Sequence, residues 1–76
     1  MEQNNPLKLG LTPIQLKCFK TIETFIEKHS YSPTVREIAN LMEMSGSGNV
    51  HRLVKELERR GWIRKWPRMR RSIQII

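Results

Sequence analysis

The chain has 76 residues, of which 38% are hydrophobic, and it carries a net charge of +7. This length allows one small domain and leaves little room for a deep, supported pocket. No stretch approaches the roughly 18 consecutive apolar residues of a membrane span, and the polar start MEQNNP does not resemble a secretory signal. We therefore expect a cytoplasmic domain with no membrane partner.

The positive charge is concentrated at the C-terminal end. Residues 1–50 contain five basic and five acidic residues, whereas residues 51–76 contain nine basic and two acidic ones. A neutral body with one basic end is typical of a domain that binds a polyanion such as nucleic acid. The alternative interpretation is a basic face that is merely solvated. An anionic membrane surface fits less well, because no basic amphipathic helix presents an open apolar face.

A first helix is predicted from Pro13 to His29. Thr12 and Gln15 have the spacing of a capping box, and Pro13 falls at the first helical position, where its missing N–H costs nothing. One face of this helix is apolar: Ile14, Cys18, Ile22, Phe25 and Ile26. The single cysteine cannot form an internal disulfide, so a buried and inert thiol is expected.

A second, shorter helix follows the helix-breaking sequence SYSP. The stretch TVREIANLM has Thr34 as its expected N-cap and Glu37 three residues later, which again fits a capping box. Its buried stripe is expected to be Ile38, Leu41 and Met42. A helix this short is marginal alone, so packing must hold it.

The third helix is predicted from its unbroken apolar spacing at Val50, Leu53, Val54 and Leu57. Gly61 stands where a left-handed C-cap belongs. The segments WIRKW and SIQII flank PRMRR and are predicted to be strands of a hairpin. The expected fold is therefore a mostly α winged helix-turn-helix over residues 11–76, preceded by a flexible segment at 1–10. The expected core is Ile14, Ile22, Phe25, Ile38, Leu41, Leu53, Val54, Leu57 and Ile63.

The segment SGSG, directly before the third helix, allows three interpretations. A nucleotide-binding glycine loop follows a strand and commonly ends in Gly-Lys-Ser/Thr, whereas this one follows a helix and has no such lysine. A slack linker is disfavoured because a core-facing stripe begins within two residues of Gly48. The segment is thus expected to be a tight turn that lets the third helix approach a surface closely.

The outward residues at the start of the third helix suit contact with DNA. They are Ser47, Gly48, Asn49, His51, Arg52 and Lys55. Ser and Asn can hydrogen-bond to base edges or phosphates, and Arg can bind guanine or phosphate. For any one of them, a solvated helix face is an equally good explanation. As a set beside the basic C-terminal end, they favour nucleic acid.

The pieces LTPIQ, SPTVREIA and VHRLVKELERRGWIR resemble the DNA-binding domain of LexA-type repressors, and the resemblance runs from about Leu11 to Ile75. It implies sequence-specific binding of double-stranded DNA by a transcriptional repressor of a bacterium, phage or mobile element. It also implies that the third helix reads bases in the major groove, while the wing contacts the DNA backbone. The base-reading residues would be Ser47, Gly48, Asn49, His51 and Arg52. We expect backbone contacts from Thr34, Lys55, Arg64, Lys65, Arg68, Arg70 and Arg71.

The sequence departs from that family at three points, one of which is the wing RKWPRMRR, which is more basic and aromatic than expected. LexA-type repressors also carry a self-cleaving peptidase domain through which they dimerise. The resemblance covers none of it, so cleavage is not expected here and pairing on palindromic DNA stays an open alternative. Glu43 stands where such repressors commonly have a glycine, so this turn must be made differently or with strain.

Catalysis is not expected. The chain has no Asp, and His29 and His51 lie on different predicted helices with only Cys18 to share a metal. We therefore expect no catalytic residue, no metal site and no cofactor. The main alternative to DNA binding is a protein-interaction module, since fold does not fix function. Trp66, expected to be exposed near the wing tip with Arg64 nearby, has the composition of an interface hot spot.

Overall fold

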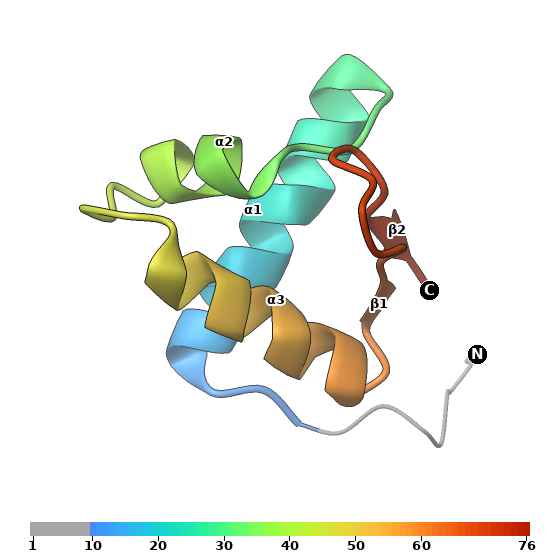
Figure 1. Cartoon of the computed structure of the whole chain (residues 1–76). Helices are drawn as coiled ribbons and strands as arrows, with labels where there is room; N and C mark the ends of the chain where they lie inside the picture. Colours follow the sequence, from blue (N-terminus) through green and yellow to red (C-terminus); the bar gives the residue numbers. More distant parts are fainter. Residues whose placement is uncertain (1–9) are drawn as a thin grey trace.

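A computed structural model of the chain describes residues 10–76. Its elements are α1 (Pro13–His29), α2 (Val35–Leu41), α3 (Gly48–Arg59), β1 (Ile63–Arg64) and β2 (Gln74–Ile75). Helix α1 lies behind α2 and α3 and packs against both, and the antiparallel strands lie beside the end of α3 (Figure 1). The fold is a mostly α winged helix-turn-helix, as predicted. We call residues 63–75 the wing. Apart from Gly10, the expected flexible segment lies outside the described residues.

Both predicted capping boxes are formed. At the start of α1, Gln15 N donates to Thr12 Oγ1 (3.3 Å) and Thr12 N donates to Gln15 Oε1 (3.0 Å). At the start of α2, Glu37 N donates to Thr34 Oγ1 (3.1 Å) and Thr34 N donates to Glu37 Oε1 (2.9 Å). Each box satisfies N–H groups that a helix start leaves without partners. These local contacts fix where α1 and α2 begin.

One hydrophobic core joins all three helices to the wing. Its buried members are Cys18, Phe19, Ile22, Ile38, Ala39, Met42, Val50, Val54, Leu57, Ile63 and Ile73. Phe25 is also buried, and Leu53 is partly buried against the core. Burial raises the pKa of the Cys18 thiol to about 11, so it stays neutral at physiological pH, as expected for an inert thiol.

The prediction that Ile14 and Leu41 belong to the core was wrong. Ile14 is 45% exposed and Leu41 is 57% exposed. In α1 the buried face begins one residue later, at Gln15. In α2 the buried face is completed by Ala39 and Met42 beside Ile38, which leaves Leu41 at its outer edge. The apolar pattern identified both helices correctly but did not fix their rotation about the helix axis.

The turns after α2 and α3 have the same hydrogen-bond pattern. Met44 N donates to Ala39 O (2.9 Å) after α2, and Trp62 N donates to Leu57 O (3.0 Å) after α3. Each turn needs one left-handed residue, which is Glu43 (φ 58°) in the first and Gly61 (φ 88°) in the second. The predicted left-handed residue at Gly61 is confirmed, and it directly follows the C-cap residue Arg60. The turn at Glu43 is made without glycine, in a region that disfavours residues with a Cβ.

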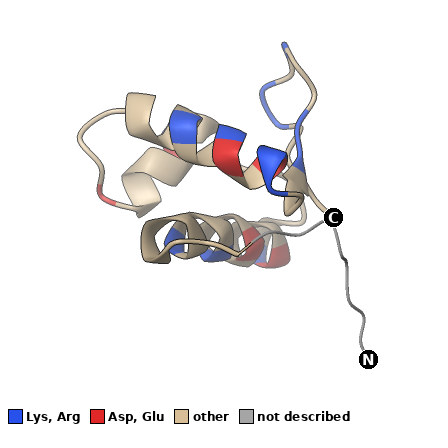
Figure 2. Ribbon diagram, turned by 90° about the horizontal axis from the view of Figure 1, so that it is seen from below, with Lys and Arg blue, Asp and Glu red and all other residues tan. Residues whose placement is uncertain are grey.

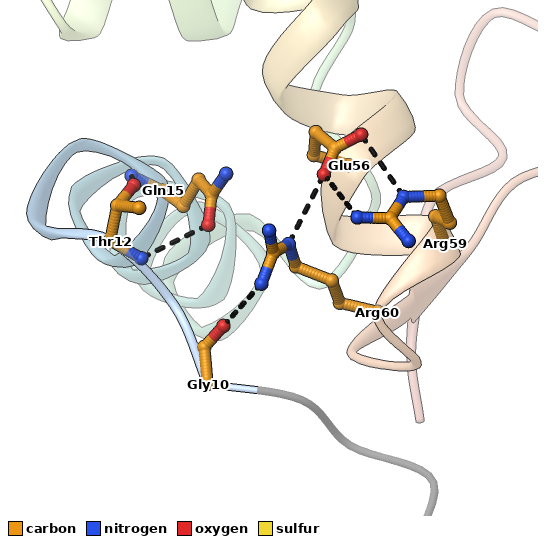
Figure 3. A network of polar contacts seen from close by, with 6 residues as sticks. All are labelled: Gly10, Thr12, Gln15, Glu56, Arg59 and Arg60. Atoms are coloured by element: carbon orange, nitrogen blue, oxygen red, sulfur yellow. Dashed lines mark hydrogen bonds and ion pairs between the residues drawn. The ribbon is translucent and has the colours of Figure 1, made fainter.

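Polar contacts join the start of α1 to the end of α3 (Figure 3). Arg60 Nη1 donates to Gly10 O (2.7 Å), and Arg60 Nε donates to Glu56 Oε1 (3.1 Å). Arg59 donates two further hydrogen bonds to the same carboxylate. The hydrogen bonds from Arg59 and Arg60 lower the pKa of Glu56 to about 2. Glu56 therefore stays ionised at neutral pH and holds both arginines.

The wing strands are shorter than predicted. The strands expected over WIRKW and SIQII are reduced to two residues each, paired as Ile63 with Ile75 and Arg64 with Gln74. The reason is a side chain that replaces the strand ladder. Ser72 Oγ accepts a hydrogen bond from Trp66 N (3.1 Å) and lies 3.0 Å from both Trp66 O and Met69 O. The loop between the strands is therefore wide, and Ser72 closes it.

Candidate nucleic-acid interface

A surface hollow of about 390 Å³ lies between the start of α2, the start of α3 and the wing. It brings together residues that are far apart in the sequence. Six of its lining residues were predicted as site residues: Thr34, Ser47, His51, Lys65, Arg68 and Arg70. The others are Val35, Arg36 and Met69. The fold thus places members of the base-reading set and of the backbone set on one continuous surface.

The lining of this hollow is strongly basic. Arg36, Lys65, Arg68 and Arg70 all contribute to it, and none of the described residues that line it is acidic. The side chains of Arg36, Arg68 and Arg70 form no ion pair with any other described residue. Low-dielectric walls around charges of one sign concentrate the field within a hollow. The surface is therefore suited to an anionic ligand with several charges.

Helix α3 presents the predicted reading residues to solvent. Gly48, Asn49, His51, Arg52 and Lys55 are all exposed, and Ser47 is half-buried at the N-cap, where its hydroxyl makes no cap hydrogen bond. Figure 2 shows Lys and Arg residues along α3 and on the wing loop, which projects on the side of the molecule away from α1. Of the predicted base-reading residues, only Ser47 and His51 line the hollow. Gly48, Asn49 and Arg52 lie outside it.

Nothing within the described residues explains the glycine at position 48. A Cβ placed there would meet no atom within 4 Å, and its φ is not in the left-handed region. Neither packing nor backbone conformation therefore requires glycine at this point of the fold. The open space at Gly48 would admit the surface of a partner.

A second hollow, of about 500 Å³, continues along α3 toward the base of the wing. It shares His51 and Lys65 with the first and adds Lys55, Val54, Glu58 and Pro67. The backbone N of Lys65 donates to Glu58 Oε2 (3.4 Å), which holds the base of the wing against α3. Lys55 is thus joined to the same surface as the wing residues.

The remaining predicted wing residues lie outside both hollows. The Arg64 guanidinium lies 6.0 Å from the ring of Trp66, and that ring is 41% exposed. Trp62 is partly buried and packs edge-on against Phe19, with ring centroids 5.2 Å apart. Arg71 lines neither hollow and pairs with Glu37. The basic residues of the wing therefore have different surroundings: some line the hollow, Arg64 lies near Trp66, and Arg71 pairs with Glu37.

Arg36 and Met69 line the first hollow but were not among the predicted site residues. Arg36 is the second residue after the N-cap of α2, so its position in the first turn of a capped helix could have suggested it. Met69 stands between Arg68 and Arg70 in the sequence and lies beside them in the wing loop. No pattern in the sequence distinguishes Met69 from a core residue, although it is 57% exposed.

A third hollow, of about 600 Å³, is larger than these two; it lies between α1 and α2 and shares no residue with them. Its lining includes Lys17, Thr21, Thr24, Lys28 and Leu41. Its size does not make it the site, because the predicted site residues are absent from its lining. Among residues 10–76, no group of three His, Cys, Asp or Glu side chains could hold a metal ion.

Comparison with known proteins agrees with this geometry. The family model described as the LexA DNA binding domain matches residues 8–72. The chain belongs to the LexA DNA-binding domain family. This family is named for DNA binding, and the match includes both helices of the helix-turn-helix and most of the wing.

Among its relatives are LexA repressors of several organisms. That of Magnetococcus marinus is 37% identical over 67 residues, which are 88% of this chain and 29% of the repressor. That of Geobacter metallireducens is 35% identical over 66 residues, 87% of this chain and 33% of the repressor. That of Frankia casuarinae is 31% identical over 71 residues, 93% and 28% respectively. This LexA-family chain thus spans about a third or less of the length of these repressors. Within residues 10–76, no helix is long and apolar enough to cross a bilayer.

Proposed function

We propose that this domain binds double-stranded DNA sequence-specifically and represses transcription in the bacterial cytoplasm. Helix α3 would enter the major groove and read bases with Ser47, Gly48, Asn49, His51 and Arg52. Backbone contacts would come from Thr34, Lys55, Arg64, Lys65, Arg68 and Arg70, to which we add Arg36. The observation that carries the proposal is the basic hollow between α2, α3 and the wing, since none of the described residues that line it is acidic.

The physical argument rests on two kinds of contact. Positive side chains neutralise phosphates and position the domain, but they carry no sequence information. Base edges are read by side chains such as Asn, which pairs bidentately with adenine, and Arg, which pairs bidentately with guanine. Asn49 and Arg52 are exposed on α3 outside its buried stripe. The open space at Gly48 would allow the backbone of α3 to approach the DNA closely.

A second candidate function is protein binding through the wing. Its specific support is Trp66, which is 41% exposed and lies beside Arg64. Trp and Arg are enriched at the energetic centres of protein interfaces. The same pair could also pack against the DNA backbone. Replacing Trp66 with Ala and measuring DNA affinity would separate these roles, because a protein-binding Trp66 has no part in DNA binding.

The decisive experiment measures affinity for a selected DNA site and for random duplex at two salt concentrations. In Asn49→Ala and Arg52→Ala, each lost contact should reduce discrimination between the two DNAs by about 1–3 kcal/mol. Affinity for random duplex should change much less in Asn49→Ala, because non-specific binding depends on charge. Melting temperatures should stay close to wild type, since both side chains are exposed.

Lys28→Ala provides the control for general effects of charge. Lys28 lies in the last turn of α1, outside the hollow between α2, α3 and the wing. Discrimination by this variant should equal that of the wild type. Full discrimination by both α3 variants, or selection that yields no preferred site while a protein partner is recovered, would contradict base reading.

One domain covers a single half-site, so two copies on a palindrome should bind with half-sites about one helical turn, or a multiple of it, apart.

A further inference from the structure

Arg71 links the wing to the start of α2. Its Nη1 donates to Glu37 Oε1 (2.9 Å) and to Ser32 O (3.0 Å), and its Nη2 donates to Glu37 Oε2 (3.0 Å). Its Cζ atom also lies 4.8 Å from the centroid of the Tyr31 ring. The guanidinium thus meets a carboxylate, a backbone carbonyl and an aromatic face at once. All of these partners lie 34 or more positions earlier in the chain.

A second contact beside this pair joins the same two segments. Ile73 N donates to Ser32 Oγ (3.0 Å), and both Ser32 and Ile73 are buried. Figure 1 shows the wing loop running next to the connection between α1 and α2. Arg71, Glu37, Ser32, Tyr31 and Ile73 therefore form one cluster, which we name the wing latch. Glu37 belongs both to the latch and to the capping box of α2.

We propose that Arg71 is a positioning residue, which fixes the wing against α2 so that Arg68 and Arg70 face the same DNA as α3. This inference rests on the proposed function of DNA binding. It differs from our expectation that Arg71 itself contacts a phosphate. A guanidinium that is paired bidentately with a carboxylate must give up that pair before it can bind a phosphate in the same way.

The arrangement of charges explains why a carboxylate is retained so near a surface for DNA. Among the described residues, Arg36, Arg68 and Arg70 line the hollow and form no ion pair with an acidic side chain. Arg71, which lies in the same wing loop as Arg68 and Arg70, is paired with Glu37. Hydrogen bonds from Arg71, and then from Thr34, lower the pKa of Glu37 to about 2, so the latch stays charged at neutral pH. The negative charge of Glu37 weakens the long-range attraction of the domain to DNA. Glu37 compensates for this loss by holding the wing in place through Arg71.

The test uses Glu37→Gln, in which electrostatics and positioning predict opposite results. Gln keeps an oxygen that can accept from Thr34 N, so the capping box can survive, but it removes the charge that holds Arg71. Pure electrostatics predicts tighter binding to a mixed-sequence duplex, because the domain becomes more positive. The latch predicts weaker binding, by about two- to fivefold, because fivefold is the upper limit of what an exposed ion pair contributes. Equal or tighter binding by Glu37→Gln would overturn the inference.

Arg71→Lys tests the geometry of the contact. Lysine keeps the charge but cannot form the two-pronged pair with Glu37. The latch predicts that this variant loses as much affinity as Glu37→Gln and that the double variant is little worse than either single one. Wild-type affinity in Arg71→Lys would show that Arg71 acts as a point charge on a phosphate, and the inference would fail.

Two matched controls carry the same substitutions elsewhere. Arg59 forms a similar two-pronged pair with Glu56 within α3, and Arg59→Lys should bind as the wild type does. Glu23 pairs with Lys20 on α1, and Glu23→Gln should bind equally well or slightly more tightly. A loss of affinity in either control that matches the latch variants would overturn the assignment to Arg71 and Glu37.

NMR relaxation measurements on the free domain test the latch independently of the proposed DNA binding. The amides of Met69 and Arg70 should become more mobile in Glu37→Gln and in Arg71→Lys, but not in the controls. If the wild type bound no duplex DNA, DNA binding would fail while these amides still tested the latch. Unchanged wing mobility in both variants would show that the latch does not hold the wing.

Discussion

The turns that end α2 and α3 show how one residue can be tolerated in an unfavourable conformation. Both turns have the same hydrogen bonds, yet one has Gly61 at its left-handed position and the other has Glu43. A residue with a Cβ in this region costs roughly 1–2 kcal/mol. The sequence predicted Gly61 because glycine at a helix end is a local signal, whereas the unusual turn at Glu43 was expected only from the resemblance to LexA-type repressors, which commonly have glycine there. It could not predict the pairing of Arg71 with Glu37, since no local rule connects residues 34 positions apart.

Replacing Glu43 with Gly should therefore stabilise the domain. Relief of the left-handed strain is partly offset by the extra freedom of glycine in the unfolded chain, which leaves a gain of about 0.5–1 kcal/mol. Gly61→Ala is the matched control and should lose about 1–2 kcal/mol, because it introduces a Cβ at φ 88°. Urea unfolding of both variants measures these changes. A Glu43→Gly variant less stable than the wild type would show that the Glu43 side chain outweighs the strain.

At the scale of whole elements, periodicity identified α1 and α3 because their buried faces are long enough to define a stripe. α2 has seven residues, and its stripe was assigned to Leu41 in place of Ala39. The wing strands were predicted too long because strand propensity does not account for Ser72, whose hydroxyl binds the backbone of Trp66. In both elements, contacts with the rest of the molecule decided what the local pattern left open.

Leu57 tests the assignment of α3 as a packed helix. It is fully buried in the core, so Leu57→Ala should cost about 2–5 kcal/mol by leaving a cavity. That is a large part of the stability of so small a domain. Leu41→Ala is the control with the same chemical change at a 57% exposed position, and it should stay within about 0.5 kcal/mol of the wild type. Equal thermal melting of the two variants would contradict the described core.

Across the whole molecule, the fold gathers basic side chains from two segments that are far apart in the sequence. Arg36 comes from α2, whereas Lys65, Arg68 and Arg70 come from the wing, and they meet at the hollow beside the start of α3. The charge count predicted a basic C-terminal end, and the resemblance predicted which helix it would accompany. Neither could indicate that Arg36 joins the wing residues or that Arg71 pairs with Glu37 instead of lining the hollow, because both depend on how the wing packs against α2.

The dependence of binding on salt tests this division of the wing arginines. Each phosphate contact that is lost should lower the slope of log affinity against log salt concentration by about 0.9. Arg70→Ala should show this change on selected and random duplexes alike, because a phosphate contact carries no sequence information. Lys28→Ala removes the same charge from the end of α1 and should leave the slope unchanged, since Lys28 does not line the hollow beside α3. If Arg70→Ala instead altered sequence preference while the slope stayed intact, the wing would be reading bases from a groove, and its arginines would belong with Asn49 and Arg52.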